Sequence, residues 1–316
     1  MNLPQNFADV DTAREIAYSL YPDAQNITMI GHSHDNIVAL VDTRYAVRFP
    51  RDKNAYARSL YERHIIKQLE NAETLKIPSI LCEYADPPYV ITSFVPGHHI
   101  SSANVRALSK NYQQDFAKSV ARFAYTMHTT FVLDEELPLR EELGLDKLED
   151  NEPWPVYYKR VVRNGDFPTA KQDELAKKCY ADWVNLCDVA PTVVVHDDLH
   201  TENMMFDDGN NLLGILDFGD TNAGTPEQEL RQLYRIGEDV MLAAVQEYQR
   251  LSGRKLNVEA IKLWAIMKEL ADYSKALEAK NTNHHSFKRA ARNLNTWLPN
   301  GEWGKGYDLS SIEGHQ

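Results

Sequence analysis

Short apolar runs separated by polar turns dominate the first part of the chain, and this alternation is typical of antiparallel strands. Two segments, 11–21 and 54–71, instead have apolar residues at helical spacing. We expect Asp11 to cap the first helix, with Ile16 and Leu20 on one face. The expected strands lie at 27–30, 37–41, 45–50, 77–83 and 89–94.

The pattern becomes helical beyond the segment Val-Pro-Gly at 95–97, which interrupts regular structure. Further helices are expected at 171–188, 227–251 and 258–279, the second as one long helix or a broken pair. An acid-rich stretch at 134–151 is expected to be a mobile, solvated connector. One more helix has an apolar face whose members recur at spacings of four, three and four: Phe116, Val120, Phe123 and Met127.

These patterns predict an α+β protein in two parts. Residues 1–95 form a small, β-rich N-terminal lobe, and residues 96–316 form a larger, mostly helical lobe. Within the second lobe, we expect the helix at 171–188 to pack Trp183 and Leu186 against a buried strand that follows it.

The most informative stretch of the chain has three short apolar runs, expected to be strands: 193–195, 204–206 and 212–216. The sequence Asp-Asp-Gly-Asn at 207–210 is typical of a turn between two strands. Polar residues follow the strand ends directly. We therefore expect Asp198, Asn203 and Asp217 to lie in one small region.

This stretch has the residue types that phosphoryl transfer requires, namely a carboxylate that accepts a hydroxyl proton and oxygen ligands for Mg²⁺. In the pattern His-x-Asp-x-x-x-x-Asn, which begins at His196, Asp198 is the candidate base and Asn203 a neutral metal ligand. Asp217 is the candidate for a second metal ligand. Singly, an aspartate can be a turn residue and His196 a core residue that bonds backbone groups. Their joint order and spacing favour catalysis.

The segments H-D-D-L-H-T-E-N and G-I-L-D-F-G-D resemble the signatures of the aminoglycoside phosphotransferase family, small-molecule kinases with a protein-kinase-like fold. Asp197 departs from them, since protein kinases usually carry arginine there and this family commonly carries glycine. The segment at 225–230 resembles the family's D-P-x-x-D-L, with Thr225 and Glu229 replacing the aspartates. The resemblance implies a bilobal fold and Mg²⁺-dependent transfer of the γ-phosphate of ATP or GTP to a hydroxyl group of a small molecule.

The resemblance also implies where the nucleotide binds. Arg48 occupies the third strand at the place of the family's phosphate-binding lysine, and a guanidinium can hold phosphates through its forked donors. Lys53 is an alternative. Glu62, on the next helix, is expected to orient Arg48; the alternative is a solvated helix glutamate. The backbone near Ser93 and Val95 is expected to pair with the purine edge.

The first candidate for the acceptor is an aminoglycoside-like antibiotic, a polycation that such kinases bind with acidic residues of their C-terminal helices. The matching residues here are Glu238, Asp239, Glu269 and Asp272. Arg235 departs from this pattern, and solvated helix faces explain the four acids equally well. Alternatives are the same chemistry on a macrolide, choline, homoserine or a sugar, or a nucleotide-binding pseudokinase.

Composition narrows the possible partners and the cellular location of the protein. Asp and Glu number 46 against 34 Lys and Arg, and the resulting net charge of −12 argues against a nucleic-acid partner and favours a cationic one. No stretch has the apolar length of a membrane helix, and the first residues do not resemble a signal peptide. The three cysteines have no paired spacing. We therefore expect a cytoplasmic protein with no membrane partner.

Overall fold

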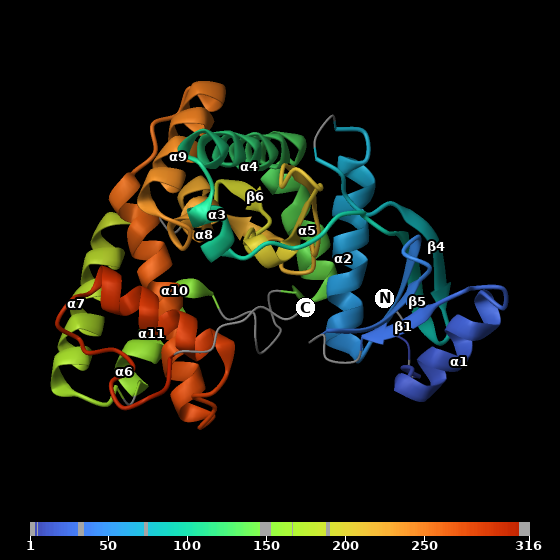
Figure 1. The fold of residues 1–316 in the computed structure, drawn as a ribbon, viewed down its shortest axis with the longest axis horizontal. Helices are drawn as coiled ribbons and strands as arrows, with labels where there is room; N and C mark the ends of the chain where they lie inside the picture. Colours follow the sequence, from blue (N-terminus) through green and yellow to red (C-terminus); the bar gives the residue numbers. More distant parts are fainter. Residues whose placement is uncertain are drawn as a thin grey trace. The chain divides into compact units, whose positions relative to one another are not determined.

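The structure is a computed structural model that describes residues 4, 6–30, 35–72, 75–145, 153–165, 167–187 and 190–309 (Figure 1). Its contacts divide the chain into two compact units. The first unit comprises 1–100, 122–151 and 192–223, and the second comprises 101–121, 152–191 and 224–316. The N-terminal sheet and the stretch that contains Asp198 and Asp217 therefore belong to the same unit. The lobes at 1–95 and 96–316 are a different division and stay a prediction.

A five-stranded antiparallel sheet forms the N-terminal part of the first unit, in the order β1-β2-β3-β5-β4. Its strands are β1 (Ile27–Ile30), β2 (Asn36–Val41), β3 (Tyr45–Pro50), β4 (Ile80–Ala85) and β5 (Pro88–Ser93). All five predicted strands are confirmed. The fourth begins at Ile80 rather than at Ile77, because Pro78 has no N–H to donate to a ladder.

One face of this sheet carries a hydrophobic core. Its buried side chains alternate along β2 and β3: Ile37, Ala39, Val41, Val47 and Phe49. Successive side chains of a strand point to opposite faces, so Arg48 lies on the face away from this core. β3 is the middle strand of the five, which gives Arg48 a neighbouring strand on each side.

Helix α1 (Val10–Leu20) packs against this core but differs in detail from the prediction. Asp9 caps the helix, so the predicted cap at Asp11 is wrong by two residues. Leu20 is 37% exposed and does not belong to the packed face as predicted. Small side chains let the helix approach the sheet closely, and the buried residues are Ala13 and Ala17.

Two further helices in the first unit carry residues important for the site. α2 (Lys53–Leu69) confirms the helix predicted at 54–71, and the Asp52 carboxylate caps it. α5 (Leu133–Leu143) lies within the stretch predicted to be a mobile connector, so that prediction is wrong for these residues. Acids in the first turn of α5 favour a helix N-terminus, and Gly144 ends the helix in the left-handed conformation. Residues 146–152 lie outside the described part of the chain.

The informative central stretch folds into short strands. β6 (Val193–Val195) pairs with β9 (Asn222–Gly224), and β7 (Met204–Phe206) forms a hairpin with β8 (Leu212–Ile215). The three predicted strands are thereby confirmed. The apolar face predicted between Phe116 and Met127 is confirmed as well, since all four of its members are buried on α4 (Lys110–Thr130).

Helices build the second unit: α3 (Ser102–Ala107), α6 (Trp154–Asn164), α7 (Ala170–Leu186), α8 (Pro226–Tyr234), α9 (Glu238–Ser252), α10 (Val258–Glu278) and α11 (His285–Trp297). α8 and α9 are the broken pair predicted at 227–251, whereas α3, α6 and α11 were not predicted. The core lies around α10, where three aromatic rings meet edge to face: Tyr158, Trp183 and Trp264.

Helix α7 buries Trp183 against α6 and α10. Its Leu186 is 49% exposed, so the predicted burial of this residue is wrong. Among the described helices, none is long and apolar enough to cross a membrane.

Candidate active site

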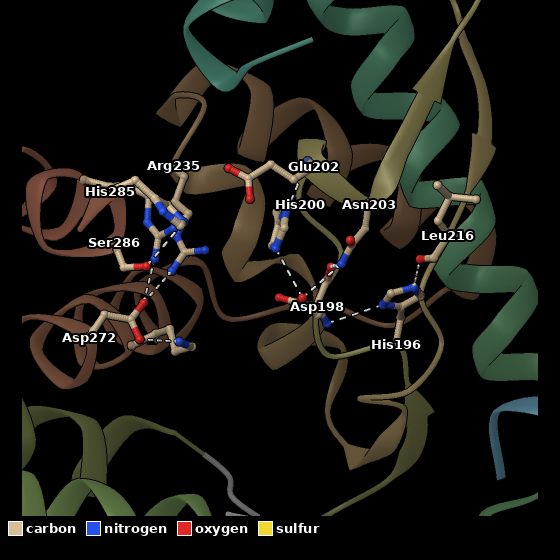
Figure 2. Close-up of polar contacts among 12 residues, drawn as sticks. His196, Asp198, His200, Glu202, Asn203, Leu216, Arg235, Asp272, His285 and Ser286 are labelled. Carbon is tan, nitrogen blue, oxygen red and sulfur yellow. Dashed lines mark hydrogen bonds and ion pairs between the residues drawn. The ribbon is translucent and has the colours of Figure 1, made fainter. Parts of the chain in front are cut away.

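The loop that follows β6 is anchored by His196, whose side chain is completely buried. Its Nε2 donates to the carbonyl oxygen of Leu216 at 3.0 Å, and its Nδ1 accepts from the N–H of Asp198 at 3.4 Å (Figure 2). Both bonds require the tautomer that carries its proton on Nε2. The ring also packs against Phe218, with centroids 4.9 Å apart. His196 therefore acts as a core residue that joins the loop to the segment leading to Asp217.

Asp198 and Asn203 are joined directly. The amide nitrogen of Asn203 donates to both the backbone oxygen and Oδ2 of Asp198, at 3.0 and 2.9 Å (Figure 2). The amide is thereby oriented with Oδ1 as its remaining polar atom, which is the oxygen a cation would use. A backbone bond from the Leu216 N–H to the Asn203 oxygen, at 2.9 Å, ties this loop to the segment that carries Asp217. The structure thus joins the predicted base and metal-ligand segments through short contacts.

His200 is a neighbour of Asp198 that the sequence pattern did not single out. Its Nε2 lies 3.2 Å from Asp198 Oδ2, and its Nδ1 accepts from the N–H of Glu202 (Figure 2). His200 follows Asp198 by two residues, and this spacing was the only hint in the sequence. The contact forms because the loop folds back on itself in a 3₁₀ turn at Thr201–Asn203.

Two aspartates of the site have left-handed backbones. Asp197 has a φ of 65° and Asp217 a φ of 61°. This conformation is costly for residues with a Cβ, and aspartate and asparagine tolerate it better than most. A glycine after the motif histidine would adopt it freely, so Asp197 fits a backbone position for which the family commonly uses glycine. Asp217 turns its side chain toward solvent, where 59% of it is exposed.

Arg48 and Glu62 form a buried ion pair. Arg48 Nη1 lies 2.6 Å from Glu62 Oε1, and Arg48 Nη2 lies 3.9 Å from Asp217 Oδ1. Glu62 is 3% exposed, and the same oxygen accepts from the Phe218 N–H at 3.3 Å. Glu62 therefore connects the central strand of the sheet to the segment that carries Asp217. Lys53 lies on the exposed first turn of α2.

Charge and burial oppose each other in this pair. Loss of hydration favours the neutral form of Glu62 and raises the pKa of its carboxyl, even though Arg48 acts in the other direction. For Arg48, burial also disfavours the charge, but the Glu62 and Asp217 carboxylates outweigh it and raise the pKa of the guanidinium. Arg48 is consequently a permanent cation beside Asp217.

Asp220 completes a group of four carboxylates and was not among the predicted site residues. Loss of hydration, together with the charges of Asp198, Asp217 and Asp197, raises the pKa of Asp220 to about 8, and Arg58 offsets this only in part. The three neighbouring carboxylates therefore act in the same direction as the loss of hydration. Its position in the sequence, three residues after Asp217, could have identified Asp220 as a site residue. Such a group of acids favours a cation.

The predicted purine-binding backbone lies at the end of β5. The Ser93 N–H donates to the Ser79 oxygen at 2.9 Å, and the Phe94 N–H donates to the Arg44 oxygen at 2.9 Å. Both donors are thus bonded to backbone oxygens of the chain and are not available to a purine. Val95 follows with a buried side chain. The purine contact itself stays a prediction.

In the second unit, the predicted acceptor-binding acids already face cations of the chain. Glu238 lies 2.7 Å from Lys262, and Asp239 lies 2.7 Å from Lys110. The side chains of Glu238 and Asp239 are 51% and 73% exposed, so a ligand can compete for them in water.

The other two predicted acids belong to a buried ionic cluster. Glu269 is fully buried, 2.6 Å from Arg235. Asp272 lies 2.5 Å from Lys268, 2.7 Å from Arg289 and 3.5 Å from Arg235 (Figure 2). Burial favours the neutral acid, but these three cations outweigh it and hold the pKa of Asp272 well below its usual range. Arg235, which departed from the family pattern, is therefore the partner of both acids.

A family model described as the phosphotransferase enzyme family (APH) matches residues 26–270, which is most of the 316-residue chain. The chain belongs to the phosphotransferase enzyme family. The resemblance inferred from the motifs around Asp198 and Asp217 is thereby confirmed. No protein of curated function matches the sequence.

Phosphotransferases of known structure share the fold. Wild-type aminoglycoside 2'-phosphotransferase-IIIa, in complex with GDP, has a TM-score of 0.71 at 16% identity, over 92% of this chain and 98% of that one. APH(2")-IIa, in complex with gentamicin, has a TM-score of 0.62 at 18% identity, over 96% of this chain and 99% of that one. A macrolide 2'-phosphotransferase from Brachybacterium faecium has a TM-score of 0.61 at 15% identity, over 89% of this chain and 97% of that one. The predicted kinase-like α+β fold is confirmed.

The donor set fits Mg²⁺. Asn203 and Asp217 would hold it with one amide and one carboxylate oxygen, and Mg²⁺ commonly takes few protein ligands when phosphates supply the others. In the described part of the chain, no three His, Cys, Asp or Glu side chains are arranged to hold a metal by themselves. When bound, Mg²⁺ would neutralise charge on the phosphates. Arg48 places a positive charge beside Asp217, and Asp198, the predicted proton acceptor, is oriented by Asn203.

Replacing Asp198 tests the base. Asp198→Asn keeps the shape and an acceptor for Asn203, but it removes the negative charge that attracts a hydroxyl proton. We expect kcat to fall by on the order of 10²-fold or more, with nucleotide affinity nearly unchanged. Asp208→Asn, the same change on the exposed hairpin turn, is the control. Steady-state kinetics that give Asp198→Asn a near-normal kcat would remove Asp198 from the mechanism.

The raised pKa of Asp220 predicts a pH-dependent stability. Because this pKa is about 8 in the folded protein and 3.8 for an ordinary aspartate, folding favours the protonated carboxyl, and that contribution is lost as pH rises from about 4 to about 8. We expect the permanently neutral Asp220→Asn to have a higher Tm than wild type at about pH 9, with the difference vanishing near pH 4. Thermal melts of metal-free protein across this range provide the measurement. An Asp220→Asn variant that is less stable at high pH contradicts the assignment.

Proposed function

We propose that this phosphotransferase transfers the γ-phosphoryl group of ATP or GTP to a hydroxyl group of a small molecule, with Mg²⁺ as the cofactor. The observation that carries the proposal is the hydrogen-bonded pair of Asp198 and Asn203, tied through the Leu216 backbone to the segment that carries Asp217. A nucleotide-binding pseudokinase would have no use for an oriented carboxylate at this place. The reaction suits the cytoplasm, where a free and exposed thiol such as Cys82 is stable.

In the proposed reaction, the acceptor oxygen forms a bond to the γ-phosphorus, and the bond between that phosphorus and the β,γ-bridging oxygen breaks. The hydroxyl proton passes to Asp198, whose orientation is fixed by Asn203 and by the bond from its own N–H to His196. Arg48 attracts the phosphates, while Glu62 keeps its guanidinium in place. The products are a nucleoside diphosphate and a phosphate monoester.

The first candidate for the acceptor is an aminoglycoside-like antibiotic. The net charge of −12 attracts polycations over long distances. The exposed carboxylates of Glu238 and Asp239 can exchange their lysine partners for ammonium groups of a ligand. Solved relatives bind kanamycin and gentamicin according to their names. Phosphorylation of such an antibiotic would make this protein a resistance enzyme.

A macrolide is the second candidate, and the ion pairs of the second unit favour it. All four predicted acids face cations of the chain, and Glu269 and Asp272 are held in a buried cluster with three basic residues. A ligand with fewer positive charges makes less demand on free carboxylates. Choline, homoserine and sugars remain further acceptors to test.

Turnover on a substrate panel tests the proposed function. Purified protein is given Mg²⁺, ATP or GTP, and one acceptor at a time from the aminoglycosides, macrolides, amino alcohols and sugars. Nucleoside diphosphate release that depends on one acceptor, together with its phosphate monoester detected by mass spectrometry, is the expected result. Nucleotide binding without transfer to any of these acceptors would favour the pseudokinase.

Neutralising two acids separates the two acceptor candidates. If the acceptor is a polycation, the double variant Glu238→Gln, Asp239→Asn should raise its KM several-fold, because each exposed pair contributes about 0.2–1 kcal/mol. The effect should shrink as salt rises, and kcat should barely change. Glu174→Gln, at another exposed carboxylate paired with lysine, is the control. Unchanged KM values for every cationic acceptor would refute the aminoglycoside proposal.

A further inference from the structure

A buried contact network connects α2, α5 and the segment that follows Asp217. We propose that α5 works as a clamp: its Arg140 and Glu136 are positioning residues that fix Glu62 relative to Asp217. The inference rests on the proposed function, since it concerns how the Mg²⁺ and nucleotide site is held. All of the residues involved belong to the first unit.

Arg140 holds the segment after Asp217 by its side chain. Its guanidinium donates to the backbone oxygen of Thr221 at 2.8 Å and to Oδ1 of Asn222 at 2.7 Å. Arg140 is 1% exposed, so these bonds form away from competing water. Thr221 and Asn222 come directly after the Asp-Phe-Gly-Asp motif that begins at Asp217, which places one end of the clamp next to the candidate metal ligand.

The other end of the clamp holds α2. The Arg140 guanidinium lies over the Tyr61 ring, 5.0 Å from its centroid. One turn earlier on α5, the two carboxylate oxygens of Glu136 each lie 3.1 Å from His64 Nε2. Tyr61 and His64 flank Glu62 on α2, and their rings stack on each other. Glu136 is 4% exposed. Two buried charged side chains of α5, Glu136 and Arg140, therefore contact α2 next to Glu62 in the sequence.

These contacts close a ring of interactions. Glu62 reaches the motif directly by accepting from the Phe218 N–H, and α5 reaches the same motif by way of Thr221 and Asn222. α2 is therefore tied to one short segment at two points. The Leu216 backbone and the pairing of β9 with β6 also hold this segment, and α5 adds a buried side-chain contact beside β9. Arg48 lies between Glu62 and Asp217, so the clamp determines where phosphates and metal meet.

Arg140→Met tests the clamp with readouts that packing alone would not move. Loss of the two bonds lets Asp217 shift, and a misplacement of about 1 Å in a site lowers rates by up to about 10²-fold. We expect the Kd of the Mg²⁺–nucleotide complex and the Mg²⁺ concentration for half-maximal rate each to rise on the order of tenfold. The KM of the acceptor should change less than twofold. Arg140→Lys should recover part of the loss, since it keeps a buried donor.

Arg231→Met is a matched control from the second unit. Arg231 is also buried, lies over an aromatic ring (Trp154, 5.7 Å) and donates to a backbone oxygen (Gln228). Its loss should lower Tm comparably without changing Mg²⁺ dependence. If Arg140→Met does not fold, Asn222→Ala removes one acceptor and leaves the arginine in place, and we expect it to raise the same Kd several-fold.

The outcomes separate this inference from the proposed function. Calorimetry of the Mg²⁺–nucleotide complex needs no acceptor, so a wild type that binds the complex but phosphorylates nothing refutes the proposed function and still tests the clamp. If the Arg140 and Asn222 variants bind Mg²⁺–nucleotide as tightly as Arg231→Met does, the clamp is refuted. A Kd that rises only in the Arg140 and Asn222 variants supports it.

Discussion

The organisation of the site depends on the interactions of one buried carboxylate, that of Glu62. A carboxylate that is 3% exposed loses most of its hydration, and an isolated charge in this environment is very unfavourable. It is compensated by two groups from different parts of the chain, the Arg48 guanidinium and the Phe218 N–H. Moving either β3 or the motif at Asp217 would remove one of the two partners of this charge. The cost of burial therefore enforces the geometry.

A second constraint is the crowding of negative charge. Loss of hydration and the negative charges of Asp198, Asp217 and Asp197 raise the pKa of Asp220 to about 8. Two of them also have left-handed backbones, which is unfavourable for a residue with a side chain. The fold holds these carboxylates together against repulsion, and a cation relieves it. This arrangement suits a site that is completed by a metal–nucleotide complex.

The sequence was informative where the signal is local. Alternation and turns predicted the five strands of the sheet and the hairpin of β7 and β8, and motif spacing brought Asp198 and Asn203 together. It failed at α5 for two reasons. The acids that suggested a solvated connector favour a helix start instead, and the partners of Arg140 lie 81 and 82 residues further along the chain. The acids at Glu269 and Asp272 show the same limit. Periodicity marks them as helix residues but does not reveal which cations they meet.

The most direct test of the account is a double-mutant cycle on Arg48 and Glu62, with the Kd of Mg²⁺–nucleotide measured by calorimetry on folded protein. Glu62→Gln should weaken binding on the order of tenfold although Glu62 itself is buried, since it removes the negative charge that holds Arg48 and keeps only an amide oxygen as acceptor. Arg48→Met should weaken it at least as much. If Glu62 acts through Arg48, the double variant will bind about as weakly as Arg48→Met alone. Additive losses, or a Glu62→Gln variant with wild-type affinity, would contradict the account.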